Sequence, residues 1–296
     1  MNLNHLAVFH AVAESASVSR AADRLMVSQP AVSKQLAQLE RSLKTTLADR
    51  LPRGVRLTAA GQLLADYARR IFALEHEAQR AMAELAGLHR GRLAVAATPT
   101  IGVYWLPGVL VKYRRAHPAI EMRMEIHPTP TIARLLLEGT VDVGLTESPV
   151  EVDGIDASVF MKDRLVAIAA TKHPLARHRV SAADLCREPF VVREVGSGSK
   201  SLVERALADR GLTIQPAMSL GSTEAIKRAV MEGVGVAIVS AMSVKTEIEA
   251  GRLVELRVKG LTIDRPCYLM RPQGRTKSPA LQAFLEMLNR RPRTNP

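Results

Sequence analysis

Two short helices joined by a tight turn are predicted from residues 17–43, which read SVSRAADRLMVSQPAVSKQLAQLERSL. Ser17 or Ser19 can start the first of them and Ser28 the second, because a serine hydroxyl accepts hydrogen bonds from the free N–H groups of a first helical turn. Pro30 suits that first turn, where its missing N–H would have no partner. Helical spacing of apolar residues begins earlier, at Leu6, so three helices are predicted between residues 6 and 43.

The third helix has two different faces. Val32, Leu36 and Leu39 recur with Leu43 at helical spacing and form one apolar stripe. The opposite face is small, polar and basic, which entry into the DNA major groove requires, although an ordinary solvated face has the same composition. Its residues are Pro30, Ser33, Lys34, Ala37 and Arg41.

A basic turn and a long helix follow. Arg50, Arg53, Gly54 and Arg56 could form a wing that contacts phosphates, or a solvated loop. In residues 59–90 apolar residues then recur at alternating spacings of three and four over about three heptads, between charged flanks. We expect this seam to pair two chains, and packing of the helix on its own domain is the alternative. The seam consists of Leu64, Tyr67, Ile71, Leu74, Ala78, Ala81 and Leu85.

Beyond residues 87–91 the pattern changes to short strands alternating with helices. This alternation predicts an α/β fold with largely parallel sheets. The expected strands are 93–97, 122–126, 141–145, 165–169, 190–192 and 235–239.

Four predicted helix starts in this region carry hydroxyl residues. Ligands of open α/β sheets bind beyond the carboxyl ends of strands, where helix N-termini present free N–H groups. Each hydroxyl could instead be a simple helix cap. The four starts are 98–100, 129–130, 197–199 and 221–223.

The net charge of +12 indicates anionic partners, and it is unevenly distributed. Residues 1–58 hold eight basic against four acidic residues, and residues 91–296 hold 29 against 21. Because the second excess lies outside the predicted DNA-binding segment, it favours a further anion. Two cysteines without a Cys-x-x-Cys pair predict neither a disulfide framework nor structural zinc, and we expect Cys186 and Cys267 to be incidental thiols.

The sequence contains no apolar run near the ~20 residues of a membrane span and begins without a secretory pattern, so we expect no membrane association and a cytoplasmic location. Catalytic motifs are also missing: we find no Gly-x-Ser-x-Gly elbow and no His-x-x-x-His pair, and residues 196–200 are too short for a phosphate-binding Walker A loop. No catalytic residue, metal ligand or cofactor is therefore expected.

From about Leu3 to Leu288 the chain resembles the LysR-type transcriptional regulators, a bacterial family. The resemblance is strongest over residues 17–25 and 27–33, continues at Leu36, Leu39 and Glu40, and returns at Arg53, Leu57, Thr58 and Gly61. One departure is Ala48, where the family usually has Phe. The resemblance implies a winged helix-turn-helix domain in residues 1–58, a linker and dimerisation helix in 59–90, and an effector-binding domain in 91–296. The DNA-binding residues it implies are Gln29, Pro30, Ser33, Lys34, Arg50, Arg53 and Arg56.

For the effector-binding domain the resemblance implies two Rossmann-like subdomains around a cleft, as in periplasmic solute-binding proteins. Subdomain I would comprise about 91–162 and 266–296, and subdomain II about 163–265, with chain crossings near Lys162 and Arg265. The segments 193–199 and 221–227 resemble those of the family branch that controls sulfur-assimilation and carbon-fixation genes. The implied effector residues are Thr98, Thr100, Ile101, Thr129, Glu147, Arg193, Ser197, Ser199 and Thr223.

Together these observations predict a sequence-specific DNA-binding regulator controlled by a small anionic metabolite with a carboxylate, phosphate or sulfur oxyanion. Glu147 would repel a simple dianion, so a zwitterionic effector stays open. Pro128 lacks a backbone N–H, where the family often has Gly-Asn-Thr, and this departure leaves the ligand's identity open. The expected partners are double-stranded promoter DNA and a second copy of the chain in a homodimer and then a homotetramer, and RNA polymerase is a further candidate. The alternative is an enzyme of solute-binding-like fold that acts on an anionic metabolite.

Overall fold

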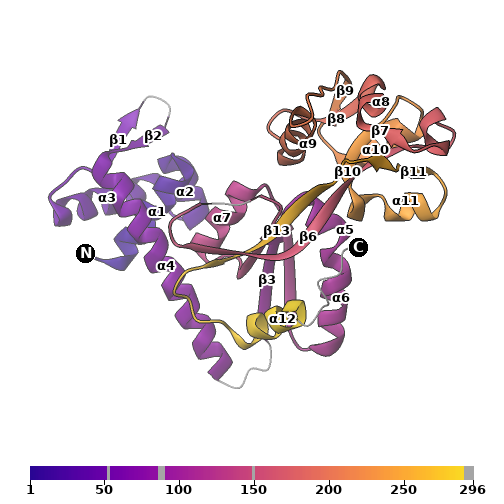
Figure 1. Ribbon diagram of the computed structural model, residues 1–296. Coiled ribbons are helices and arrows are strands. Elements are labelled where there is room, and N and C mark those ends of the chain that lie inside the picture. The colour runs from indigo at the N-terminus through magenta and orange to yellow at the C-terminus, as the bar shows by residue number, and fades with distance from the viewer. Residues whose placement is uncertain (52–53, 86–90, 149–150, 290–296) are drawn as a thin grey trace. The chain divides into compact units, whose positions relative to one another are not determined.

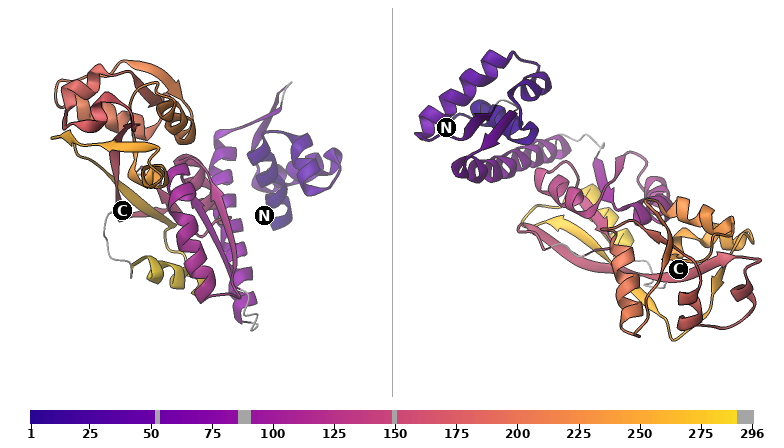
Figure 2. Two further views of the ribbon diagram at one scale, coloured as in Figure 1. Left: turned by 90° about the vertical axis from the view of Figure 1, so that its right-hand side faces the viewer. Right: turned by 90° about the horizontal axis from the view of Figure 1, so that it is seen from above.

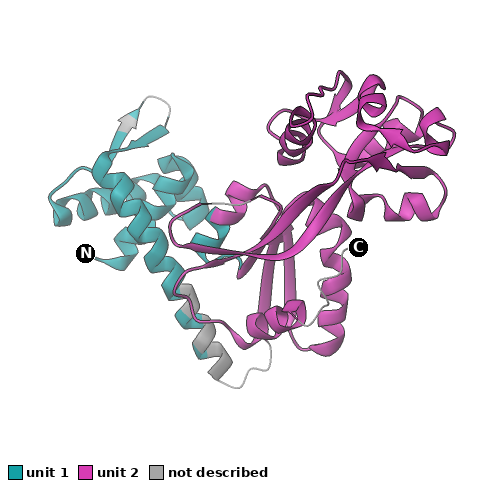
Figure 3. Ribbon diagram, viewed as in Figure 1, with its two compact units in different colours: residues 1–89, 134–141 teal, residues 90–133, 142–296 magenta. Residues whose placement is uncertain are grey.

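The computed structural model describes residues 1–51, 54–85, 91–148 and 151–289 (Figure 1). The chain divides into two compact units (Figure 3). Unit 1 contains residues 1–89 and 134–141, and unit 2 contains residues 90–133 and 142–296. Among the described residues, no helix combines the length and the apolar character needed to cross a membrane.

Unit 1 begins with the three predicted helices. The predicted serine caps are confirmed, because the Ser17 hydroxyl accepts from Arg20 N at 3.3 Å and the Ser28 hydroxyl accepts from Ala31 N at 3.4 Å. Its elements are α1 (Leu3–Ser15), α2 (Val18–Leu25), α3 (Gln29–Leu43), the hairpin β1 (Ala48–Leu51) and β2 (Gly54–Leu57), and α4 (Ala59–Leu85).

The apolar stripe of α3 is buried as predicted. Leu36 and Leu39 pack against Leu6 and Phe9 of α1, while Val32 joins a second cluster between α1 and α2. Because one face of α3 is used in this way, its other face is left for solvent or a ligand.

Two tight contacts fix the hairpin to the helices. Gly54 has φ +107°, and a Cβ there would lie 2.7 Å from the carbonyl oxygen of Ala16. A Cβ on Gly61 would lie 1.9 Å from the carbonyl oxygen of Leu47, so the first turn of α4 fits there only as glycine. Thr58 caps this turn by accepting from Gly61 N at 3.0 Å.

The apolar seam of α4 divides between two roles, which differs from the expected single stripe. Leu64 and Ile71 pack on the unit's own core, beside the fully buried Ala68. Tyr67 and Leu74 remain 52% and 65% exposed. The outward apolar stripe is therefore rotated from the predicted one, and its described members are Leu63, Tyr67, Leu74 and Ala78. The side chains of Ala81 and Leu85 lie outside the described residues.

From residue 92 onward strands and helices alternate as predicted. The first part contains β3 (Arg92–Ala97), α5 (Pro99–Tyr104), α6 (Leu106–Ala116), β4 (Glu121–Ile126), α7 (Thr129–Glu138), β5 (Val143–Thr146) and β6 (Ile155–Ala170). The second part contains the 3₁₀ helix η1 (Pro174–Arg177), β7 (Val180–Ser181), α8 (Ala182–Arg187), β8 (Phe190–Arg193), α9 (Gly198–Ala208), β9 (Pro216–Leu220), α10 (Thr223–Met231), β10 (Ala237–Ser240), the 3₁₀ helix η2 (Ala241–Ser243), α11 (Lys245–Glu249), β11 (Leu253–Leu256), β12 (Val258–Lys259), β13 (Ile263–Pro272) and α12 (Pro279–Asn289).

The main sheet has the strand order β10-β6-β13-β5-β3-β4 within the described residues, and β11 also pairs with β6. β3 is parallel to β4 and β5, as expected, but β6 and β13 are long and antiparallel. These two strands run side by side and join the half of unit 2 that contains β3–β5 to the half that contains β7–β12 (Figure 1, Figure 2). The prediction of a strand at 165–169 was too short, because β6 begins at Ile155.

Alternation along β6 places helices on both faces of the second half. Leu165 and Ala167 face a core that includes Val203 of α9, whereas Val166 faces a core that includes Ile226 of α10. In the first half, α6 and α12 pack together on one face of β3 and β5. Helices α5, α7, α9 and α10 each begin shortly after a strand (β3, β4, β8 and β9 respectively), where a ligand site is expected.

Candidate functional site

The outward face of α3 carries the residues expected to contact DNA. Gln29, Pro30 and Lys34 are exposed, and Ser33 is half-buried beside them. An amide, a hydroxyl and an ammonium group can hydrogen-bond base edges or phosphates. The polarity of this exposed helix face suits a major groove.

The hairpin contributes a second part of this surface. Arg56 on β2 is exposed and lies opposite Asp49 on β1, with 3.3 Å between Nη2 and Oδ2. Phosphate contact by Arg56 would therefore compete with an exposed ion pair, which is weak in water. Arg53 and the side chain of Arg50 lie outside the described residues.

In unit 2 the expected effector residues converge from several elements. At the end of β8, Arg193 Nη1 donates to the hydroxyl of Thr223, the first residue of α10, at 3.4 Å. Tyr104 at the end of α5 donates to Glu224 of α10 at 2.6 Å. A Cβ on Gly198 at the start of α9 would lie 3.0 Å from Ser148 Oγ, just after β5. Contacts between the two halves thus bring these starts together.

The hydroxyl residues at three of these starts do not cap their helices. Thr98, Ser197 and Ser222 hold the N-cap positions of α5, α9 and α10, and none accepts a hydrogen bond from the first turn. The α5 start is instead occupied by Glu147, whose carboxylate accepts from Ile101 N at 3.1 Å. The first-turn N–H groups of α9 and α10 are left to favour an anion.

Arg193 is already partly neutralised by its neighbour. Its Nε and Nη2 each donate to a carboxylate oxygen of Glu194 at 2.7 Å, and these hydrogen bonds lower the pKa of Glu194. Only Nη1 is directed to α10. An effector that displaced Glu194 could accept hydrogen bonds from Nε and Nη2 of Arg193 as well as from Nη1.

Arg265 is a site residue that the sequence marked only as a chain crossing. Its Nη2 and Nε contact Asp163 Oδ2 at 2.5 and 3.1 Å, and both side chains are buried. Nη1 donates to Ser199 Oγ at the start of α9 at 2.9 Å, and Ser240 satisfies the other Asp163 oxygen. Arg265 therefore presents an N–H donor at the α9 start, while Asp163 balances its charge. The sequence feature that could have identified this pair is the run of charged residues Lys162–Arg164, directly before the apolar residues of the same strand.

A second buried cation lies at the α10 start and was also missed. Lys227 is 2% exposed, and its Nζ contacts Glu224 at 2.6 Å and Glu247 at 2.7 Å and donates to the Ser243 carbonyl at 2.8 Å. Its ammonium also lies 5.0 Å from the centre of the Tyr104 ring. Burial, followed by the hydrogen bond to Glu224, raises the pKa of Tyr104, so this phenol stays protonated and able to donate.

Some predicted residues are not part of the convergence. Thr129 is the first residue of α7 and Pro130 the second. Among the described residues, no hydrogen bond joins the Thr129 side chain to the group above. A cavity beside Arg193 and Ser199 has only about 20 Å³, room for about one water molecule. A metabolite would bind on the converging surface or widen this cavity.

The cysteines show no activation. Burial raises the pKa of both thiols, and raises that of Cys267 to about 12. Neither would be a thiolate near neutral pH, which argues against a redox role.

Within the described ranges, no cluster of three or more His, Cys, Asp or Glu side chains is arranged to hold a metal ion.

Comparison with family models gives two matches. Residues 3–62 match the bacterial regulatory helix-turn-helix protein of the lysR family, and residues 86–293 match the LysR substrate binding domain. The chain is 37% identical over 289 residues to a RuBisCO operon transcriptional regulator of Allochromatium vinosum, covering 97% of this chain and 95% of that one.

Two solved structures are similar to parts or all of the chain. The regulatory domain of CcmR from Synechocystis PCC6803, in complex with 2-PG, is 28% identical with a TM-score of 0.61 and covers 68% of this chain and 96% of its own. Full-length CbnR complexed with its target DNA is 26% identical with a TM-score of 0.58, covering 98% and 99%.

Proposed function

Because this chain belongs to the LysR family of transcriptional regulators, and is a regulator with an effector-binding domain and not an enzyme, we propose that it controls carbon-fixation genes in response to a small anion. The anion binds in unit 2 against the starts of α9 and α10. The observation that carries the ligand assignment is the pair of uncapped starts beside Arg193 and Arg265.

The chemistry of this site favours a phosphate or carboxylate. Helix N-termini present N–H donors and a partial positive charge, and a guanidinium adds a planar pair of donors. Glu147 caps α5, so its negative charge is engaged by the first turn of that helix. The case for a zwitterionic effector is therefore weaker than the sequence alone suggested. Of the predicted effector residues, Thr129 lies away from the others. The structure adds Arg265 and Tyr104. The proposed site otherwise keeps Thr98, Thr100, Ile101, Glu147, Arg193, Ser197, Ser199 and Thr223.

DNA recognition is assigned to unit 1. Gln29 and Ser33 read base edges, while Lys34 and the wing arginines Arg50, Arg53 and Arg56 contact phosphates. Pro30 lies at the same surface. Target DNA is present in the related CbnR complex, which supports this assignment. A DNA-bound regulator works in the cytoplasm, with RNA polymerase as a further partner.

We infer a DNA-binding domain in residues 1–58, a linker and dimerisation helix in 59–90 and an effector-binding domain in 91–296, whose subdomains I and II are joined by β6 and β13. Dimerisation through the outward stripe of α4 pairs two reading helices, and two dimers form the homotetramer. The effector acts by binding one arrangement of the assembly more tightly than another, which is the thermodynamic requirement for coupling.

Calorimetry of the full-length protein with 2-PG tests the anion site. We expect saturable binding that Arg193→Ala weakens by about 1.5–3 kcal/mol, the range for a charged hydrogen bond. Arg187→Ala is the matched control, because this exposed arginine pairs with Asp184 on α8, outside the site. Equal affinity in the wild type and Arg193→Ala would remove Arg193 from the site, and failure of 2-PG and of simple phosphate and carboxylate probes to bind would overturn the anion assignment.

A further inference from the structure

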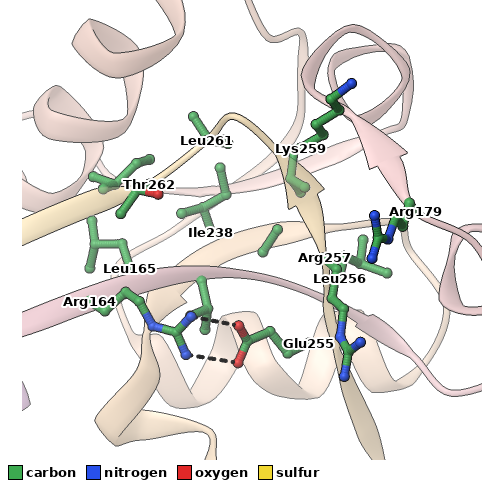
Figure 4. Close-up of a pocket in the computed structure, with 14 residues that line it drawn as sticks. Arg164, Leu165, Arg179, Ile238, Glu255, Leu256, Arg257, Lys259, Leu261 and Thr262 are labelled. Atoms are coloured by element: carbon green, nitrogen blue, oxygen red, sulfur yellow. Dashed lines mark hydrogen bonds and ion pairs between the residues drawn. The ribbon is translucent and has the colours of Figure 1, made fainter. Parts of the chain in front are cut away.

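A larger cavity opens on the second half of unit 2. It shares Ile238 with the small cavity beside Arg193 and Ser199, but it contains none of the residues proposed to bind the effector. It has about 370 Å³, within the range of about 300–1,000 Å³ typical of small-molecule sites. Its walls come from β6, β10, β11 and β12 and from the segment that leads into β13 (Figure 4). Its size alone admits an organic molecule.

The floor of the cavity is apolar. Leu165, Ala167, Ile238, Leu256 and Ile263 line it, and all five belong to the hydrophobic core beneath α9. Each is at most 9% exposed, so the cavity reaches down to the core of this half. An apolar ligand body would displace water from this floor, which is favourable.

The rim is strongly cationic. At one side Arg164 pairs with Glu255, with Nη1 to Oε1 at 3.1 Å and Nη2 to Oε2 at 3.3 Å. Arg179, Arg257 and Lys259 lie on the other side in Figure 4, and all three are exposed. Within the part of the chain that the structure describes, none of these three has a carboxylate within 4.0 Å. Three positive charges therefore stand beside an apolar floor without a protein counter-charge.

We propose that this cavity binds a small amphipathic organic anion, a carboxylate attached to an aromatic or branched apolar body. The body lies on Leu165, Ile238 and Leu256, and the carboxylate faces Arg179 and Arg257. Inorganic phosphate has no apolar part, so it would leave the apolar floor exposed to water. A neutral apolar molecule would cover the floor but would leave the rim cations without a counter-charge. The ligand also contacts the residues that directly follow Asp163 on β6, so a second metabolite acts on the strand that joins the two halves.

Calorimetry of the full-length protein with sodium 4-phenylbutyrate tests the proposal, with 4-phenylbutanol and 4-phenylbutylamine as neutral and cationic analogues. We expect saturable one-to-one binding of the carboxylate, at least fivefold weaker binding of the alcohol, and none of the amine at the same concentrations. Added salt should weaken the carboxylate more than the alcohol, because salt screens exposed charges. Equal affinities for the carboxylate and the alcohol would overturn the anion assignment.

Rim variants locate the binding. Arg257→Glu should lower the affinity for 4-phenylbutyrate about tenfold, since it removes one cation and adds an anion. Arg252→Glu makes the same change at an exposed residue just before β11, outside the lining, and should have no effect. Thr262→Trp, at the exposed mouth, should abolish binding by filling the opening. Equal losses in Arg257→Glu and Arg252→Glu would contradict a specific site.

Two further measurements separate this site from the effector site and from an interface. Arg257→Glu should bind 2-PG as the wild type does, and Arg193→Ala should bind 4-phenylbutyrate as the wild type does; reciprocal losses would mean a single shared site and would overturn the proposal. Sedimentation of Arg257→Glu should show an unchanged assembly. A smaller assembly would identify the cavity as a contact between copies of the chain, in place of a metabolite site.

Discussion

Hydroxyl residues stand at helix starts in both units, but the two units use them differently. In unit 1, Ser17, Ser28 and Thr58 all accept hydrogen bonds from the first turns of their helices. In unit 2, Ser181 does the same for α8, whereas Thr98, Ser197 and Ser222 do not cap α5, α9 and α10. The starts of α9 and α10, which no side chain caps, lie beside Arg265 and Arg193. A hydroxyl that merely stabilises a helix is thus distinguished from one at a binding surface by whether it caps.

Removal of the buried charge beneath these starts should have the largest effect. Asp163→Asn leaves Arg265 unpaired and should destabilise unit 2 by about 3–5 kcal/mol. Urea unfolding of the full chain measures this, because the single tryptophan, Trp105, lies in unit 2 and packs beside Phe160. Arg123→Leu breaks the exposed pair with Glu125 and should change stability by less than about 1 kcal/mol. Similar small losses in both variants would mean that the buried pair contributes no more than a surface pair.

The corresponding sensitive surface of unit 1 is the outward stripe of α4. Leu74→Glu should weaken self-association more than tenfold, because it would place an unpaired charge in an apolar interface. Sedimentation velocity over a range of concentrations measures the change. Gln79→Glu adds the same charge on the other side of α4 and should leave the assembly intact. A wild-type distribution of species for Leu74→Glu would show that the chains join through another surface.

DNA reading should depend on the face of α3 that the core leaves free. Gln29→Ala should cost about 1–3 kcal/mol on the operator and little on scrambled DNA, as expected for a lost base contact. Fluorescence anisotropy with both duplexes measures the difference. Gln38→Ala, on the opposite side of α3, is the control. Equal losses on both duplexes would move Gln29 from the base-reading group to the phosphate contacts.

The smallest effects test the difference in capping itself. Ser28→Ala should destabilise unit 1 by about 1 kcal/mol, the usual loss for a working cap. Ser222→Ala, at a start that its hydroxyl does not cap, should change the stability of unit 2 by only a few tenths of a kcal/mol. Thermal unfolding followed by circular dichroism and by Trp105 fluorescence measures the two. A loss near 1 kcal/mol in Ser222→Ala would remove the distinction between the units.

Local features were predictable from the sequence. The helices of unit 1, their serine caps and the buried face of α3 depend on neighbours within a few residues, and the structure confirms them. The α/β alternation after residue 91 is equally local. The family resemblance added the DNA-binding and effector-binding roles, which no single motif would have established.

Features that depend on distant contacts were not predictable. Asp163 and Arg265 are 102 positions apart and meet only because the pairing of β6 with β13 places them opposite each other. The run of charges in β6 interrupted its apolar pattern, so the predicted strand began too late. In α4, heptad spacing identifies the apolar residues without showing which of them also pack on the chain's own core, as the partly buried Ile71 does.

The length of β6 has a mechanical consequence. Asp163 is the ninth of its 16 residues, so the buried pair lies near the middle of a strand about 50 Å long. If the strand turned as a stiff lever about that point, a rotation of about 5° would move each end by about 2 Å, in opposite directions. Because the pivot lies at mid-length, a displacement of one end of β6 would produce an equal and opposite displacement of the other end. A ligand bound at either end would therefore move the opposite end by the same amount.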